Sequence, residues 1–93
     1  MHNPHHPGEI LKADVLPQLR MTVGELAAHL GVSRPHLSRI VNGRSRITAE
    51  MDLRLSEALS QPPGLWIRMR ASYDLWQAAQ QPREAVKPLR LAA

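Results

Sequence analysis

The chain has 93 residues, of which 43% are apolar, and it contains neither Cys nor Phe. A chain of this length forms one domain around one modest aliphatic core, which leaves no room for an enzyme built around a deep pocket. The absence of cysteine excludes a disulfide framework and a cysteine zinc site. The formal net charge of +4 suits an anionic partner, either nucleic acid or a membrane surface.

No apolar run approaches the roughly 18 residues that a membrane span requires, and no signal peptide opens the chain. We therefore expect a cytoplasmic protein that does not associate with a membrane. The predicted organisation is a helical domain over 1–80 and a tail over 81–93.

The first predicted helix opens at Pro7 and Gly8, with Glu9 near its positive end. Pro17 is expected to end or kink this helix, because proline cannot donate the helical hydrogen bond. Its inward-facing residues are expected to be Ile10, Leu11 and Val15.

The segment TVGELAAHLGVSRPHLSRIVN, at 22–42, has the residue spacing of a helix-turn-helix. Ala27 falls where the two helices must approach closely, and Gly31 falls where the chain leaves the first helix with a positive φ. Thr22 with Glu25 predicts a capping box. Residues expected on the inward faces are Leu26, Leu30, Val32, Leu37 and Ile40. The alternative is an ordinary helical hairpin in a helical domain.

The second helix of this motif is expected over 33–42. Ser33 is either its cap or the residue before the cap, because Pro35 prefers the first helical position but tolerates the second. No Asp or Glu occurs from Leu26 to Ala49, although this stretch carries four arginines. A surface that faces a polyanion requires this exclusion of acids, whereas the alternative is a solvated basic surface.

The exposed face of the second helix predicts contacts in the major groove of duplex DNA. Arg34, Ser38 and Arg39 are the candidates for reading bases, because a planar guanidinium donates two parallel hydrogen bonds to guanine. His36 lies beside them. Pro35 can make only apolar contacts, such as one with a thymine methyl group.

A second group of residues is expected to hold phosphates, which fixes the register on DNA without reading sequence. Arg44 and Arg46 follow Gly43 in the loop after the second helix. Thr22 lies at the start of the first helix, where free amides favour an anion. Ser33 and Asn42, at the two ends of the second helix, complete the expected phosphate contacts.

Two further helices are predicted after the motif. Thr48 caps the fourth helix, which stops at Gln61 to Gly64. Its buried face is expected to include Met51, Leu55, Ala58 and Leu59. The fifth helix runs from about Leu65 to Gln80, and Pro82 opens a basic tail that is either disordered or extended.

An aromatic and apolar stripe runs along the fifth helix at spacings of three and four residues. Trp66 and Met69 are expected to pack in the core. Tyr73 and Trp76 lie beyond the reach of a four-helix core and are candidates for a subunit interface. A dimer also suits DNA recognition, because two helices about 34 Å apart read two half-sites of a palindrome.

The motif GVSRPHLSRIVNGRSRIT resembles the Xre/Cro class of helix-turn-helix proteins. HPGEIL at 6–11, together with LWIRMRASYDLW at 65–76, resembles the HigA-type antitoxins of bacterial toxin-antitoxin modules. The resemblance covers nearly all of residues 6–77. The family usually carries Leu-Gln where this chain has Met69 and Arg70.

This resemblance implies an all-α, five-helix lambda-repressor-like fold with an extended C-terminal helix and a short tail. It also implies an antitoxin that neutralises a RelE/HigB-like ribonuclease toxin and, as a homodimer, represses its own operon at a palindromic operator. The alternative function is a stand-alone Xre-family repressor without a toxin, and a weaker one is a helical interaction module that never binds DNA.

Catalysis and metal binding are not expected. No nucleophile, base and orienting group can be assembled, because the Ser, His and acidic residues have simpler roles in capping and packing. His2, His5 and His6 form a cluster near the N-terminus, but no carboxylate or Cys stands at ligand spacing. We predict no enzyme activity, no cofactor and no metal.

Overall fold

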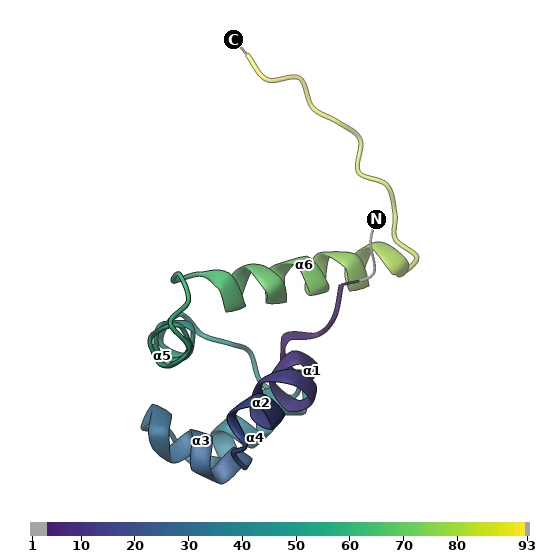
Figure 1. The fold of residues 1–93 in the computed structure, drawn as a ribbon. Coiled ribbons are helices and arrows are strands. Elements are labelled where there is room, and N and C mark those ends of the chain that lie inside the picture. Colours follow the sequence, from purple (N-terminus) through teal and green to yellow (C-terminus); the bar gives the residue numbers. More distant parts are fainter. Residues whose placement is uncertain (1–3, 93) are drawn as a thin grey trace.

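The computed structural model describes residues 4–92, which form helices and no strand (Figure 1). The elements are α1 (Pro7–Ile10), η1 (Leu11–Val15), α2 (Leu16–Leu19), α3 (Val23–Leu30), α4 (Arg34–Val41), α5 (Ala49–Leu59) and α6 (Leu65–Gln80). The first three are continuous, so the predicted all-α architecture of five helices is confirmed. In Figure 1, α3 and α4 lie on the opposite side of the molecule from α6.

The first helix does not end at Pro17 but continues to Leu19. The π-helical turn η1 lies just before the proline, and its wider hydrogen bond joins the Leu16 amide to the Leu11 carbonyl. A π turn displaces the preceding carbonyls, so that a proline ring and a missing donor are tolerated. Arg20, with φ 55°, ends the helical stretch.

Both helices of the predicted helix-turn-helix have the expected boundaries. The Glu25 amide donates to Thr22 Oγ1 at 3.1 Å and the Thr22 amide donates to Glu25 Oε1 at 2.9 Å, which is the predicted capping box. Gly31 has φ 76° and Ala27 is buried at the helix contact. The expected inward-facing leucines and isoleucine are buried, and Val32 is half-buried against them.

The hydrophobic core is aliphatic apart from one tryptophan. It consists of Leu11, Leu16, Leu26, Ala27, Leu30, Leu37, Ile40, Val41, Ile47, Met51, Leu55 and Trp66. Met69 packs against its edge, as predicted. The Trp66 Nε1 group donates to Gln61 Oε1 at 2.9 Å, so the buried indole keeps its hydrogen bond.

The prediction for α5 was wrong at one position. Thr48 caps the helix by accepting from the Met51 amide at 3.2 Å, but Ala58 is exposed rather than buried. The buried face of α5 is instead rotated toward Asp52 and Ser56. Ala58 therefore lines an open surface hollow beside Arg54.

The tail beyond Gln81 is extended and runs away from the helices (Figure 1). Its apolar side chains are exposed by 80–91% at Val86, Leu89 and Leu91. The tail thus contributes nothing to the core.

Candidate nucleic-acid interface

The exposed face of α4 carries the predicted base-reading residues. Arg34, Pro35 and Arg39 are exposed, whereas His36 and Ser38 are half-buried. Ser33 is the cap itself, since its Oγ accepts from the His36 amide at 3.2 Å and Pro35 takes the second helical position. The structure thus brings these side chains together on one surface-exposed helix.

The inward face of α4 is fixed from two sides. Leu37, Ile40 and Val41 are buried, and α3 packs against the helix at one side. On the other side, α1 lies so close that a Cβ atom on Gly8 would overlap the carbonyl oxygens of Ile40 and Val41. The partially positive start of α1 therefore meets the partially negative end of α4, which is a favourable arrangement of helix dipoles.

The predicted phosphate contacts surround this helix. Arg44 and Arg46 are exposed in the segment after Gly43, whose φ is 74°. The Arg44 amide donates to the Arg39 carbonyl at 2.7 Å, which ties the start of this segment to α4. Thr22 is exposed at the first turn of α3.

Asn42 differs from the other predicted phosphate contacts. Its Nδ2 group donates to the Ser38 carbonyl at 2.9 Å and lies 3.4 Å from Ser38 Oγ. The same carbonyl also accepts from the Asn42 backbone amide at 3.0 Å, so the side chain adds a second donor at the end of α4. Asn42 has this structural role in addition to its predicted one.

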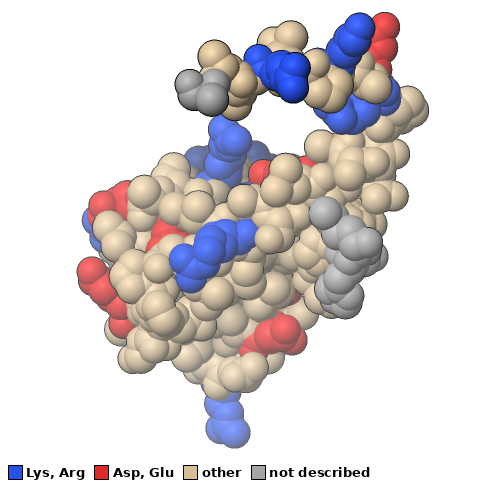
Figure 2. All heavy atoms as spheres, turned by 90° about the horizontal axis from the view of Figure 1, so that it is seen from above, with Lys and Arg blue, Asp and Glu red and all other residues tan. Residues whose placement is uncertain are grey.

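Within residues 4–92, the arginines of this surface form no ion pair. The ion pairs within residues 4–92 are Arg54–Glu50 and Arg70–Asp74, and neither includes an arginine of α4 or of the following segment. The view from the side of α6 and the tail shows acidic and basic side chains together (Figure 2). The acid-free stretch from Leu26 to Ala49 contains all of α4 and the basic segment that follows it.

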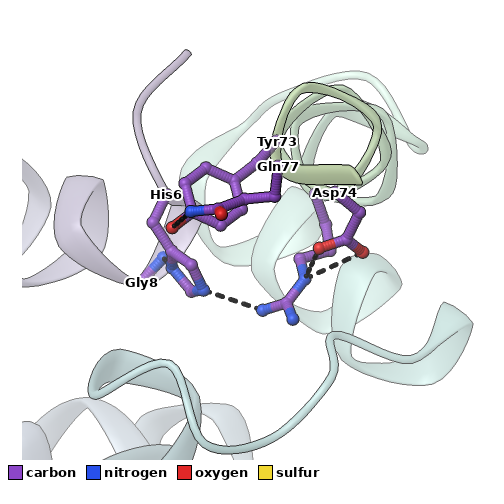
Figure 3. A network of polar contacts seen from close by, with 6 residues as sticks. His6, Gly8, Tyr73, Asp74 and Gln77 are labelled. Atoms are coloured by element: carbon purple, nitrogen blue, oxygen red, sulfur yellow. Dashed lines mark hydrogen bonds and ion pairs between the residues drawn. The ribbon is translucent and has the colours of Figure 1, made fainter. Parts of the chain in front are cut away.

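Tyr73 is less isolated than the sequence suggested. Its ring packs edge-on against His6, with centroids 4.8 Å apart, and its hydroxyl accepts from Gln77 Nε2 at 2.7 Å (Figure 3). The turn before α1 thus reaches the outer half of α6, which the expectation of a four-helix core overlooked. Tyr73 and Trp76 are both half-buried.

His6 joins three parts of the fold. Its Nδ1 atom accepts from the Gly8 amide at 2.9 Å and so caps α1, and its Nε2 atom lies 2.8 Å from Arg70 Nη1 (Figure 3). Burial, and then the adjacent Arg70 charge, lower the pKa of His6 below 6.5, although Glu9 and Asp74 oppose this. The predicted histidine cluster of His2, His5 and His6 lies partly outside the described residues 4–92, because it includes His2.

Two polar residues with roles in this fold escaped the sequence analysis. Asp52 is a buried carboxylate that accepts from the amides at the start of α6, and Arg54 Nη1 donates to the Leu30 carbonyl at the end of α3 at 2.7 Å. The signal for Asp52 was an acid between the apolar positions Met51 and Leu55. No local signal identified the partner of Arg54.

The close crossing of α3 and α4, with a basic exposed face on the second helix, defines a helix-turn-helix DNA-binding protein. The model of the helix-turn-helix family HTH_3 matches residues 11–66. The chain belongs to this family, and its relatives there include the HigA antitoxins. The family is not enzymatic, which agrees with the predicted absence of catalysis.

Three proteins illustrate the similarity. Virulence-associated protein A′ of Dichelobacter nodosus is 40% identical over 90 residues, covering 96% of this chain and 77% of that protein. A structure of Pseudomonas aeruginosa antitoxin HigA with the higBA promoter has a TM-score of 0.77 and 32% identity, covering 83% of this chain and 84% of the other. PA4674 from Pseudomonas aeruginosa in complex with its operator DNA has a TM-score of 0.84 and 30% identity, covering 96% and 100%.

None of the helices between residues 4 and 92 combines the length and the apolar character needed to cross a bilayer.

Proposed function

We propose that this chain is an antitoxin that represses its own operon and neutralises a RelE/HigB-like ribonuclease toxin. The observation that carries the DNA-binding part is the exposed, acid-free face of α4 with Arg34 and Arg39. Two guanidinium groups on one helix can each donate a pair of hydrogen bonds to guanine O6 and N7 in a major groove. Similarity to HigA bound to a promoter and to PA4674 bound to an operator supports the same conclusion.

The proposed DNA contacts divide into two sets. Arg34, Ser38 and Arg39 read bases, aided by His36 and Pro35. Thr22, Ser33, Asn42, Arg44 and Arg46 hold phosphates. The second set fixes the helix in the groove, and the first set supplies the sequence preference.

The toxin part of the proposal rests on the relationship to HigA antitoxins. In such a module the antitoxin binds the ribonuclease directly, so both proteins act in one compartment, which we propose is the cytoplasm. The remote location of α6 relative to α3 and α4 leaves a surface on which a protein partner can be bound without blocking the DNA-binding face (Figure 1).

We further propose that the DNA-binding form is a homodimer. A single recognition helix reads only a few base pairs, whereas a twofold dimer reads both half-sites of a palindrome. Trp76 and the exposed edge of Tyr73 remain the proposed contacts between subunits. Leu75, which is 66% exposed on the same helix, adds apolar surface near them.

A stand-alone Xre-type repressor is the second candidate. The basic face of α4 favours it equally, because this face serves operator binding with or without a toxin. The two candidates therefore differ only in the protein partner.

Co-purification of the tagged chain with the product of the adjacent gene, followed by gel shift on the DNA upstream of both genes, tests the proposal. A stable complex that silences a ribonuclease and shifts a palindrome is the expected result. A shift by this chain without a bound partner leaves the stand-alone repressor. A double variant, Arg34→Ala with Arg39→Ala, should abolish the specific shift, whereas Arg83→Ala in the exposed tail is the matched control.

A further inference from the structure

Gly24, in the first turn of α3, faces the first residue of α4. A Cβ atom placed on Gly24 would lie 3.4 Å from Cδ and 3.6 Å from Nε of Arg34. The same atom would lie 3.9 Å from Thr22 Oγ1. The arginine stem therefore lies against the first turn of α3, in space that a longer side chain at position 24 would occupy.

At the other four glycines, the backbone conformation or a close backbone neighbour disfavours any larger residue. Gly31, Gly43 and Gly64 have positive φ angles, and Gly8 packs against backbone carbonyls of α4. Gly24 has neither feature: its φ is not positive and its nearest neighbours are side-chain atoms. Glycine is a poorer helix former than alanine, so helix propensity does not account for it here.

The position of Arg34 explains why residue 24 must be small. Arg34 is exposed, and its guanidinium takes part in neither ion pair found within residues 4–92. Its stem nevertheless has a defined resting place against Gly24, at the start of α3, where free amides favour a phosphate. A long side chain held at its stem reaches fewer positions than a free one and loses less entropy on binding.

We propose that Gly24 is a specificity-determining position of the DNA interface. By leaving room for the Arg34 stem along α3, Gly24 sets the direction of the guanidinium and hence the base pair that Arg34 reads. Gly24 itself touches no base and acts through Arg34, so it is a positioning residue. This inference rests on the proposed operator binding.

Two substitutions at position 24 separate a steric effect from an effect on folding. In Gly24→Ala the added Cβ atom meets Arg34 at an ordinary contact distance, so the arginine stays in place. In Gly24→Leu the branched side chain fills the resting place and forces Arg34 outward. Both residues are better helix formers than glycine, so neither variant should lower the melting temperature.

The test is a double-mutant cycle in operator binding, measured as Kd on the operator and on operators changed at single base pairs. We expect Gly24→Ala to bind like the wild type and Gly24→Leu to lose about 10-fold in affinity, which is within the range of one bidentate base contact. We also expect Gly24→Leu to alter the preference at one base pair in each half-site. In an Arg34→Ala background, Gly24→Leu should cause no further loss.

Equal losses from Gly24→Leu with and without Arg34 would overturn the inference, since position 24 would then act independently of the arginine. Unchanged affinity and base preference in Gly24→Leu would overturn it as well. If the wild-type chain binds no operator at all, the proposed function fails and the inference fails with it. Operator binding by the wild-type chain is therefore measured first, because it separates a failure of the proposed function from a failure of the inference about Gly24 alone.

Discussion

The carboxylate of Asp52 on α5 holds the start of α6, because Asp52 Oδ1 accepts from the Gly64 amide at 2.6 Å. Its Oδ2 atom accepts from the Ile67 amide at 3.0 Å. The first amides of a helix have no partner within the helix and carry partial positive charge. A residue that is only 2% exposed thus joins the two C-terminal helices through charge-assisted hydrogen bonds.

Replacement of this carboxylate should weaken the fold. Asp52→Asn keeps the size of the side chain but loses the charge and one acceptor oxygen. We expect the free energy of unfolding to fall by about 1.5–3 kcal/mol, as for a buried hydrogen bond to a charged group. Urea denaturation measures this change in the free energy of unfolding. The matched control is Asp74→Asn, which breaks a partly exposed ion pair with Arg70 and should cost at most about 1 kcal/mol. Equal losses in the two variants would contradict the role of Asp52.

Asp52 also makes stability depend on pH. Burial raises the pKa of this carboxyl, but hydrogen bonds from the amides of Gly64, Ile67 and Trp66 outweigh burial and leave the pKa below its usual value. The stabilisation is therefore complete above the unfolded pKa of about 3.9 and is lost as the pH falls through the lower pKa of the folded state. We expect Asp52→Asn to remove this part of the acid sensitivity, measured as the melting temperature below about pH 4.

His6 should make the stability of the fold depend on pH in a range closer to neutrality than Asp52 does. Its folded pKa lies below 6.5, so the unfolded chain binds the proton more tightly. The contribution of His6 is complete above about pH 6.5 and decreases as the pH falls through the folded pKa, because protonation removes the Nδ1 lone pair that caps α1. Urea denaturation at about pH 7.5 and pH 5 should show this decrease.

Two histidine variants test the assignment. Asparagine caps helices well but does not titrate, so His6→Asn should flatten the change in stability between these pH values. His5→Asn, at the exposed neighbouring position, should leave the change as in the wild type. A wild-type pH dependence that persists in His6→Asn would exclude His6 as its source.

The features that could be predicted from the sequence are those with local causes. The capping box of Thr22 and Glu25 spans three residues, and Gly31 ends α3 through its own φ, so both follow from nearby residues. The exposed face of α4 follows from helical periodicity for the same reason. Rules that use only neighbouring residues were therefore sufficient to place the candidate base-reading residues on one helix.

Contacts between distant residues could not be predicted in this way. His6 meets Tyr73 across most of the chain, and Asp52 meets amides 12 and 15 residues away. Helical periodicity says which side chains share a face but not which element covers it. The rotation of α5 that exposes Ala58 is an example, because a single alanine does not define a buried face.

The contact between α1 and α4 provides another test of the fold. Gly8→Ala places a methyl group against the carbonyl oxygens of Ile40 and Val41, the latter at 2.8 Å, and backbone cannot move aside as a side chain can. We expect a loss of about 1–3 kcal/mol in the free energy of unfolding. Gly24→Ala is the control, because its methyl group meets only the flexible Arg34 and improves helix propensity. A Gly8→Ala variant as stable as Gly24→Ala would show that α1 is not seated on α4.

The proposed subunit interface gives a prediction about assembly. Trp76 is half-buried within one chain, so Trp76→Ala should weaken dimerisation while leaving the monomer folded. Sedimentation equilibrium should show a higher dimer dissociation constant and unchanged helical circular dichroism. Leu91→Ala, on the 91% exposed tail residue, is the control. A wild-type dimer that survives Trp76→Ala unchanged would remove this residue from the interface.

Substitution of Arg44 and substitution of Arg34 should weaken DNA binding in different ways, which differ in their dependence on salt and on DNA sequence. A phosphate contact releases counterions, so Arg44→Ala should reduce the slope of log K against log salt by about 0.9 and weaken binding to operator and unrelated DNA alike. Arg34→Ala should instead cost about 1–3 kcal/mol on the operator and relax the preference at one base pair, because it reads bases. Binding titrations at several salt concentrations on both DNAs measure these effects. A loss for Arg44→Ala that is confined to the operator would contradict its phosphate assignment and place it among the base-reading residues.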